Sequence, residues 1–323
     1  MPDLASWFRR GMLGITERTW VQQLFTERPV GRRLATRFVA GEELEDATVV
    51  ARTLNVRGIS VSMDHLGEHV HDAGSAGAAL VDYLACLDRI QAEQLDANVS
   101  VKLTQLGLGV ERSIASGALE TLAKRAAKLG TTVTIDMEES TWTESTIELY
   151  ADVQQRFGNL GVAVQAYLHR TEDDLRRIMP LGGHIRLCKG AYAEPPEVAV
   201  QDRRQVDARF RHLLDMLMAA PATYPAIATH DDALIRDTYA LARRREGPFE
   251  FQMLYGVRPT IQQEILDRGH RLRVYVPYGS QWYPYLTRRL AERPANLALF
   301  LRAVVGKSVP VRKNGMSLPA TGE

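Results

Sequence analysis

The chain has 323 residues, of which 45% are hydrophobic and 24% are charged, and its formal net charge is +1. These values are typical of a globular protein, and the lack of a basic excess argues against nucleic-acid binding. The two cysteines, Cys86 and Cys188, form neither a disulfide framework nor a CxxC motif, so we expect a reducing, cytoplasmic setting. No apolar run approaches the roughly 18 residues of a membrane span, and residues 1–14 lack a signal-peptide core. A peripheral contact with a membrane stays open.

Residues 1–56 have a helical pattern. Apolar residues such as Trp7, Phe8 and Met12 recur at helical spacing. Gly41 interrupts the pattern, and the acidic run at 42–46 predicts the start of a new helix. We expect residues 1–56 to form a helical segment that packs on the following domain.

From residue 58 onward, short β-rich runs alternate with longer amphipathic runs. The predicted strands are 58–64, 98–103, 132–137, 161–167, 184–188, 226–229, 249–253 and 273–276. The predicted helices are 78–95, 117–129, 143–155, 172–178, 202–218, 231–245, 260–268 and 282–292. This alternation predicts an α/β fold, a (β/α)8 barrel over residues 57–306, followed by a flexible tail over 307–323. The alternative, a doubly wound sheet, normally carries a glycine fingerprint, and Gly107-Leu108-Gly109 lacks the third glycine because Arg112 stands there.

Polar side chains follow nearly every predicted strand, where a barrel of this kind carries its chemistry. They are Asp64, Glu68, Lys102, Asp136, Glu138, Glu139, Gln165, Arg186, Lys189, Tyr192, His230, Asp231, Gln252, Tyr275 and Tyr278, and the next helix adds Arg288 and Arg289. Each has a structural alternative: Asp231 and Glu139 as helix N-caps, and Lys102 as an ion pair with Asp136. Their recurrence at one barrel mouth favours a site, and its excess of cations suits an anionic ligand.

The stretch 184–192 is a predicted buried strand that carries two cations, and charge in a buried strand needs a partner. Arg186 and Lys189 are three residues apart, so they lie on opposite faces unless the strand ends before Lys189. The break at Gly190 favours such an end. Arg186 then points into the barrel while Lys189 turns with the loop.

Two classes of function remain open from the residues alone. One is a Schiff-base aldolase that uses Lys102 or Lys189; the other is an anion-binding barrel without catalysis. A metal site is not expected, since the spacing of His65, His69 and His71 matches no known ligand motif.

Eight strings occur in order along these strands and the last helix, and together they resemble the proline dehydrogenase family. They are VSVKL (99–103), IDME (135–138), VQAY (164–167), IRLCKGAY (185–192), ATH (228–230), FEFQ (249–252) and VYVPYG (274–279) with YLTRRLAE (285–292). The resemblance covers roughly residues 28–305 and is closest to stand-alone bacterial members. Cys188 departs from it, since a valine is typical of that position.

The resemblance implies an FAD-dependent barrel without a Rossmann domain, which oxidises L-proline to Δ1-pyrroline-5-carboxylate and passes electrons to a membrane quinone. By similarity, the proline carboxylate is bound by Arg288, Arg289 and Lys102, the proline ring packs on Tyr275 and Leu187, and Asp136 and Tyr192 lie close by. Glu68 matches a gate glutamate that pairs with the first arginine. The residues implied to contact FAD are Gln165, Arg186, Cys188, Lys189, Gly190, Ala191, His230 and Gln252.

Overall fold

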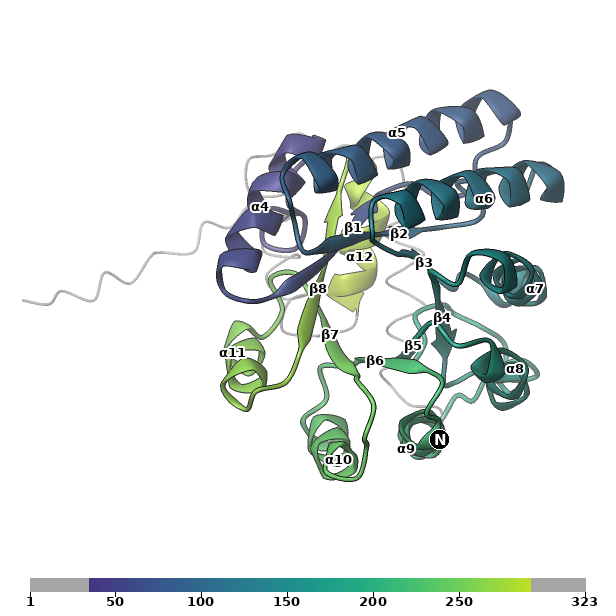
Figure 1. The fold of residues 1–323 in the computed structure, drawn as a ribbon. Coiled ribbons are helices and arrows are strands. Elements are labelled where there is room, and N and C mark those ends of the chain that lie inside the picture. The colour runs from purple at the N-terminus through teal and green to yellow at the C-terminus, as the bar shows by residue number, and fades with distance from the viewer. Residues whose placement is uncertain (1–34, 292–323) are drawn as a thin grey trace, which may run out of the picture. The chain divides into compact units, whose positions relative to one another are not determined.

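The computed structural model describes residues 35–291. Residues Ala35–Leu286 form one compact unit, and Thr287 onward belongs to a second unit. In the first unit eight parallel strands close into a barrel in sequential order, with helices outside them (Figure 1). The predicted (β/α)8 barrel is therefore confirmed.

All eight predicted strands are present. They are β1 (Ser60–His65), β2 (Ala97–Val101), β3 (Val133–Ile135), β4 (Leu160–Gln165), β5 (His184–Cys188), β6 (Tyr224–Ala228), β7 (Glu250–Leu254) and β8 (Leu272–Tyr278). The barrel closes where β1 pairs with β8, with Val61 opposite Val274 and Met63 opposite Val276.

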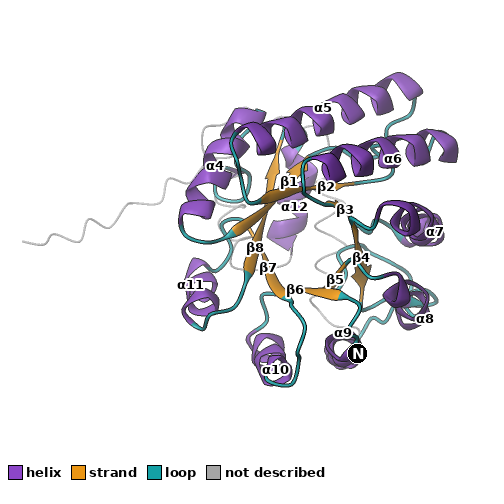
Figure 2. Ribbon diagram, viewed as in Figure 1, coloured by secondary structure: helices purple, strands orange, loops and turns teal. Residues whose placement is uncertain are grey.

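Helices follow the strands in alternation, as Figure 2 shows by colour. They are α4 (Leu44–Val56) before the barrel, then α5 (Ala73–Ala92), α6 (Arg112–Lys128), α7 (Ser140–Phe157), α8 (Thr171–Ile178), α9 (Arg203–Ala219), α10 (Asp232–Ala242), α11 (Pro259–Asp267) and α12 (Trp282–Ala291), with a short 3-10 helix, η1 (Met179–Leu181), after α8. Within residues 35–291, no helix has both the length and the apolar character that crossing a bilayer requires.

The helix that precedes the barrel begins where the acidic run predicts. Glu43 and Asp46 form a reciprocal capping box at the start of α4, which satisfies backbone N–H groups that have no partner within the helix. Ala51 and Leu54 of this helix are buried in the same hydrophobic core as the strands. Residues 1–34 and the predicted tail lie outside the described residues.

Two helix starts differ from the prediction by five residues, and α7 begins three residues earlier than predicted. The helix predicted from residue 78 begins at Ala73, because the Asp72 side chain accepts a hydrogen bond from the Ser75 N–H and caps it. The helix predicted from residue 117 begins at Arg112. The start of α5 was missed because small residues such as Ala73 and Gly77 give no apolar periodicity.

Strand alternation divides the barrel into an apolar outer layer and a polar interior. On β1, Val61 and Met63 belong to the hydrophobic core, and Met63 Sδ lies 3.9 Å from the Cys86 Sγ of α5. Ser62 and Asp64 alternate with them and are also buried. Because successive strand residues face opposite sides, Ser62 and Asp64 point into the barrel. The helices therefore stabilise the barrel from outside and leave its interior to polar groups.

Candidate active site

The polar interior of the barrel converges on Arg186. This residue lies in the middle of β5 and is only 7% exposed. Its Nη1 donates to Ser100 Oγ at 3.1 Å and forms an ion pair with Asp136, while its Nε donates to Gln252 Oε1 at 2.5 Å. The partners come from β2, from the end of β3 and from β7, so the guanidinium crosses the interior, as the sequence predicts.

Tyr275 covers the same guanidinium. Its ring centroid lies 5.3 Å from the Arg186 Cζ, and its hydroxyl donates to Asp136 Oδ2 at 2.7 Å. Burial raises the pKa of the Tyr275 hydroxyl well above its ordinary value, and the Asp136 carboxylate adds to this. Tyr275 is therefore a neutral hydrogen-bond donor, and it joins Asp136 and Arg186 in one compact cluster.

Lys102 forms a second buried cation beside this cluster. It follows β2, and its Nζ lies 2.9 Å from Asp64 Oδ1 and 4.0 Å from Asp136 Oδ2. Burial alone lowers the pKa of Lys102, but the two carboxylates outweigh burial and hold the pKa above its ordinary value. A charged lysine is a poor amine nucleophile, so this geometry argues against Lys102 as a Schiff-base residue. The predicted ion pair with Asp136 is present, but Asp64 is the nearer partner.

The loop after β5 is built around Gly190. Its φ of +125° lies where L side chains are rarely found, and an added Cβ would lie 2.3 Å from the Tyr167 ring. The next residue, Ala191, donates its N–H to Gln165 Oε1 at 3.2 Å, while Gln165 Nε2 donates to the Glu138 carbonyl at 2.9 Å. Gln165 thus ties the loop after β5 to the loop after β3.

Lys189 is the first residue beyond β5, so the predicted strand end is confirmed. Its Nζ lies 2.5 Å from Asp207 Oδ1 and 2.9 Å from Asp231 Oδ2. Asp231 is also the N-cap of α10, because its side chain accepts from the N–H groups of Ala233 and Leu234. The predicted N-cap role of Asp231 is therefore confirmed, and the same carboxylate also pairs with Lys189.

The other implied contacts lie at the same end of the barrel. Cys188 ends β5, and its Sγ donates to the Val164 carbonyl at 3.4 Å. His230 follows β6 and accepts from the Leu254 N–H at 3.0 Å through Nε2. Tyr192 lies in the loop after β5, where its carbonyl accepts from the Tyr167 hydroxyl.

Leu187 and the arginine pair lie apart from the polar cluster around Arg186. Leu187 is fully buried within the hydrophobic core, and alternation places it on the opposite face of β5 from Arg186. Its contact with the substrate ring stays a prediction. Arg288 and Arg289 lie on α12 after β8, in the second unit, and the Arg288 side chain is outside what the structure describes.

Glu138 is a buried carboxyl that the strand-end pattern included but to which it gave no role. It accepts from the Thr104 N–H at 3.1 Å and from the Thr104 hydroxyl. Burial raises its pKa from 4.5 to about 7, although the bonds from Thr104 oppose this. Glu68, half-buried in the loop after β1, is close enough for its charge to raise the pKa values of both Glu138 and Lys102. His69, Glu138 and Glu139 place donor atoms within 4.8 Å of one another, but Glu138 is engaged with Thr104.

Two further interior charges escaped the sequence reasoning. Glu250 and Arg273 form a buried ion pair between β7 and β8, with 2.8 Å between Glu250 Oε1 and Arg273 Nε. Neither follows a strand, so the strand-end rule could not select them. The available signal was alternation: Glu250 shares a face with Gln252, and Arg273 shares one with Tyr275.

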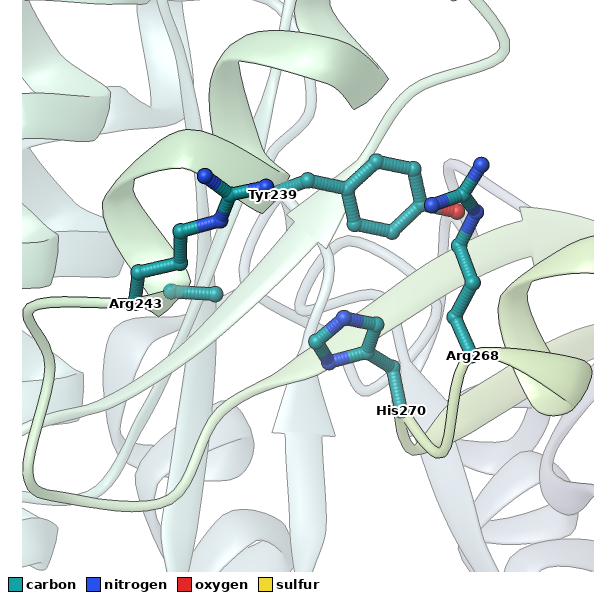
Figure 3. Close-up of a pocket in the computed structure, with 5 residues that line it drawn as sticks. Tyr239, Arg243, Arg268 and His270 are labelled. Atoms are coloured by element: carbon teal, nitrogen blue, oxygen red, sulfur yellow. The ribbon is translucent and has the colours of Figure 1, made fainter.

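A surface hollow of about 330 Å³ lies away from this site. Tyr239, Arg243, Arg268 and His270 line it (Figure 3), and the Arg268 Cζ lies 4.9 Å from the Tyr239 ring centroid. His270 precedes β8, so the hollow is at the end of the barrel opposite the site. It shares no residue with the cluster around Arg186.

Comparison with known proteins gives one family. The sequence matches the family model described as proline dehydrogenase over residues 47–301. It is 40% identical to proline dehydrogenase 1 of Bacillus subtilis over 281 residues, which covers 86% of this chain and 93% of the relative. It is also 34% identical to the proline dehydrogenase of Deinococcus radiodurans, covering 92% of this chain and 98% of the relative.

Solved structures agree at the level of the fold. The proline utilization A structure from Bdellovibrio bacteriovorus, described as inactivated by N-propargylglycine, has a TM-score of 0.77 and 24% identity. The match covers 86% of this chain but only 34% of that one, so the chain spans about a third of the larger protein. On the family match and the 40% identity over most of its length, the chain belongs to the proline dehydrogenase family, whose members oxidise proline in proline catabolism.

Proposed function

We propose that the barrel mouth oxidises L-proline to Δ1-pyrroline-5-carboxylate, with FAD accepting the hydride and a membrane quinone receiving the electrons through peripheral contact. The family match supports proline as the substrate. The observation that carries the proposal for the cofactor is Arg186, a buried cation whose direct carboxylate partner is Asp136. A cation in this position stabilises an electron-rich ring system placed next to it.

The residues at the mouth fit a flavin held by a barrel. Gly190 lets the backbone come close to a bound group, and Arg186 supplies a positive charge that, among residues 35–291, only Asp136 balances directly. Lys189 is already paired with two carboxylates, so Arg186 is the stronger electrostatic candidate. The residues that would hold FAD directly are Gln165, Arg186, Cys188, Lys189, Gly190, Ala191 and His230. Gln252, whose amide is bonded to Arg186 and Glu250, would act through Arg186. When bound, FAD supplies a two-electron acceptor.

The same mouth provides groups for the substrate. Lys102 is charged and buried, and in the proposal it binds the proline carboxylate with Arg288 and Arg289, because a fixed carboxylate needs fixed cations. Tyr275 packs on the ring, whereas Leu187, which lies in the hydrophobic core on the opposite face of β5 from Arg186, is not given this contact in the proposal. Such positioning holds the ring carbon that loses hydride near the acceptor, which accounts for much of the rate enhancement in this type of reaction.

Three further residues complete the proposed site. Asp136 keeps Arg186 and the Tyr275 hydroxyl in place through the ion pair and the hydrogen bond described above. Tyr192 lies close to the substrate. Glu68 closes the site by pairing with Arg288. The amine of proline must lose its proton before hydride leaves, so the neutral amine is the reacting form.

An anaerobic titration with L-proline tests this proposal. The purified protein should be yellow, should release FAD on denaturation, and should lose its visible flavin absorption as proline is added. Oxidised quinone should then restore the absorption. A colourless protein that borohydride links covalently to a carbonyl substrate would instead support the aldolase.

A further inference from the structure

A chain of hydrogen-bonded polar residues on β7 and β8 holds the guanidinium of Arg186 inside the barrel. Gln252 of β7 accepts from Arg186 Nε at 2.5 Å, and its own Nε2 donates to Glu250 Oε1 at 2.6 Å. Arg273 of β8 donates from Nε to the same oxygen at 2.8 Å and from Nη1 to the Val61 carbonyl at 2.9 Å. The chain therefore runs from the backbone of β1 to the centre of the site.

This chain fixes which way the Gln252 amide points. An ionised carboxylate can only accept hydrogen bonds, so the NH2 end of Gln252 must face Glu250. The amide oxygen is then left facing Arg186 Nε, which can only donate. The reversed amide would set donor against donor at Arg186 and acceptor against acceptor at Glu250, both in a buried setting where unmade bonds cost about 1–3 kcal/mol.

The ionised state of Glu250 is itself secured. Burial opposes ionisation, but the Arg273 guanidinium and its hydrogen bond lower the pKa of Glu250 below its ordinary value. Glu250 is 1% exposed, so water does not replace these partners. Arg273 thus keeps Glu250 an acceptor, and Glu250 keeps Gln252 oriented.

A neutral group at position 252 also preserves the charge of Arg186. A carboxylate there would give Arg186 a second anionic partner beside Asp136. The amide instead orients the guanidinium without neutralising it, while the negative charge of Glu250 stays one residue further away and is balanced by Arg273.

We infer that Glu250 and Gln252 are positioning residues that aim Arg186 toward the flavin and keep its charge available there. The inference rests on the proposed function, since it assigns the flavin to the neighbourhood of Arg186. It predicts that Gln252 affects the flavin only through Arg186.

The test measures the midpoint reduction potential of the bound FAD in Gln252→Met, Glu250→Gln and Arg186→Met. Each variant should disfavour flavin reduction at least tenfold, which is about 30 mV for a two-electron couple. The matched control is Gln154→Met, which removes another buried glutamine whose bonds go to Leu160 and Leu181 outside the barrel interior. The control should leave the potential unchanged.

The double variant Arg186→Met/Gln252→Met, together with the single variants, distinguishes a failure of the positioning role of Gln252 from a failure to place the flavin near Arg186. If Gln252 acts through Arg186, the double variant has the same potential as Arg186→Met. If the double variant shifts the potential beyond that of Arg186→Met by as much as Gln252→Met does alone, the positioning role is overturned. An unchanged potential in Gln252→Met also overturns it. An unchanged potential in Arg186→Met overturns instead the placement of the flavin. Glu250→Gln leaves Arg273 buried without its carboxylate, so if that variant does not fold the Gln252→Met series still decides the question.

Discussion

The buried carboxyl of Glu138 should make the protein less stable as the pH rises from 5 to 8. Its pKa is about 7 in the folded protein, against an ordinary value of 4.5. A carboxyl whose pKa is raised by folding holds its proton more tightly in the folded state. Its stabilising contribution is therefore complete below the unfolded pKa and is lost as the pH rises through the folded pKa.

The size of this effect follows from the two pKa values. A difference of about 2.5 corresponds to about 3 kcal/mol once the pH is above 7, at about 1.4 kcal/mol per tenfold change in proton affinity. About 1 kcal/mol of this is already lost at pH 5, because the unfolded carboxyl has begun to ionise there. Between pH 5 and pH 8 the Glu138 carboxyl should thus cost the fold about 2 kcal/mol.

Urea unfolding of the wild type and of Glu138→Gln at pH 5 and pH 8 measures this difference. The glutamine does not titrate, so the wild type should lose about 2 kcal/mol more than the variant over this range. The altered bonds to Thr104 contribute about equally at both pH values and cancel in the comparison. Glu264→Gln, at an exposed position of α11, should retain the pH dependence of the wild type. A Glu138→Gln variant with that same dependence would refute the reasoning.

Three further changes probe other parts of the site. Arg289→Met should raise the KM for proline by about 10- to 100-fold, because the variant loses a charge-assisted bond to the carboxylate. The FAD content, measured by absorption, should stay unchanged. An unaltered KM would remove Arg289 from the carboxylate site. Lys102→Met leaves a carboxylate buried without its partner and should cost about 3–5 kcal/mol in denaturant unfolding. Gly190→Ala should clash with Tyr167 and lower the ratio of bound flavin to protein. Gly117→Ala, on α6, has no atom near the added methyl group, so it should stabilise the protein by up to about 1 kcal/mol in denaturant unfolding.

The barrel was predictable because its strands and helices carry local signals. Buried parallel strands read as short apolar runs, and the position of β5 was predicted to the residue. Its end before Lys189 followed from alternation together with Gly190. Other boundaries shifted where the signal is not apolar: β6 begins at Tyr224 and includes Pro225, because strand pairing extends beyond the β-rich run.

The partners within the site were not predictable in the same way. Arg186 and Asp136 are far apart in sequence, and only closure of the barrel brings them together. The sequence indicated that Arg186 needs a partner, but it did not indicate which residue of another strand supplies it. Charged residues within strands, such as Glu250, were not predicted as site residues because only residues at strand ends were selected.

The polar interior changes how the stability of this barrel must be understood. In many barrels the interior is filled by branched apolar side chains; here it holds the pairs Lys102–Asp64, Arg186–Asp136 and Arg273–Glu250. Desolvation largely offsets the attraction within such buried pairs, so they add little net stability while each is expensive to break singly.

The free energy of folding must therefore come mainly from the outer layer, where strand residues such as Val61 and Met63 pack against helices. The barrel interior can then hold polar and charged groups without providing the main part of the folding free energy. In the proposed site, an anionic substrate that approaches Lys102 meets a cation already balanced by Asp64. We therefore expect proline binding to depend on further cations, and the Arg289→Met variant tests whether α12 supplies one of them.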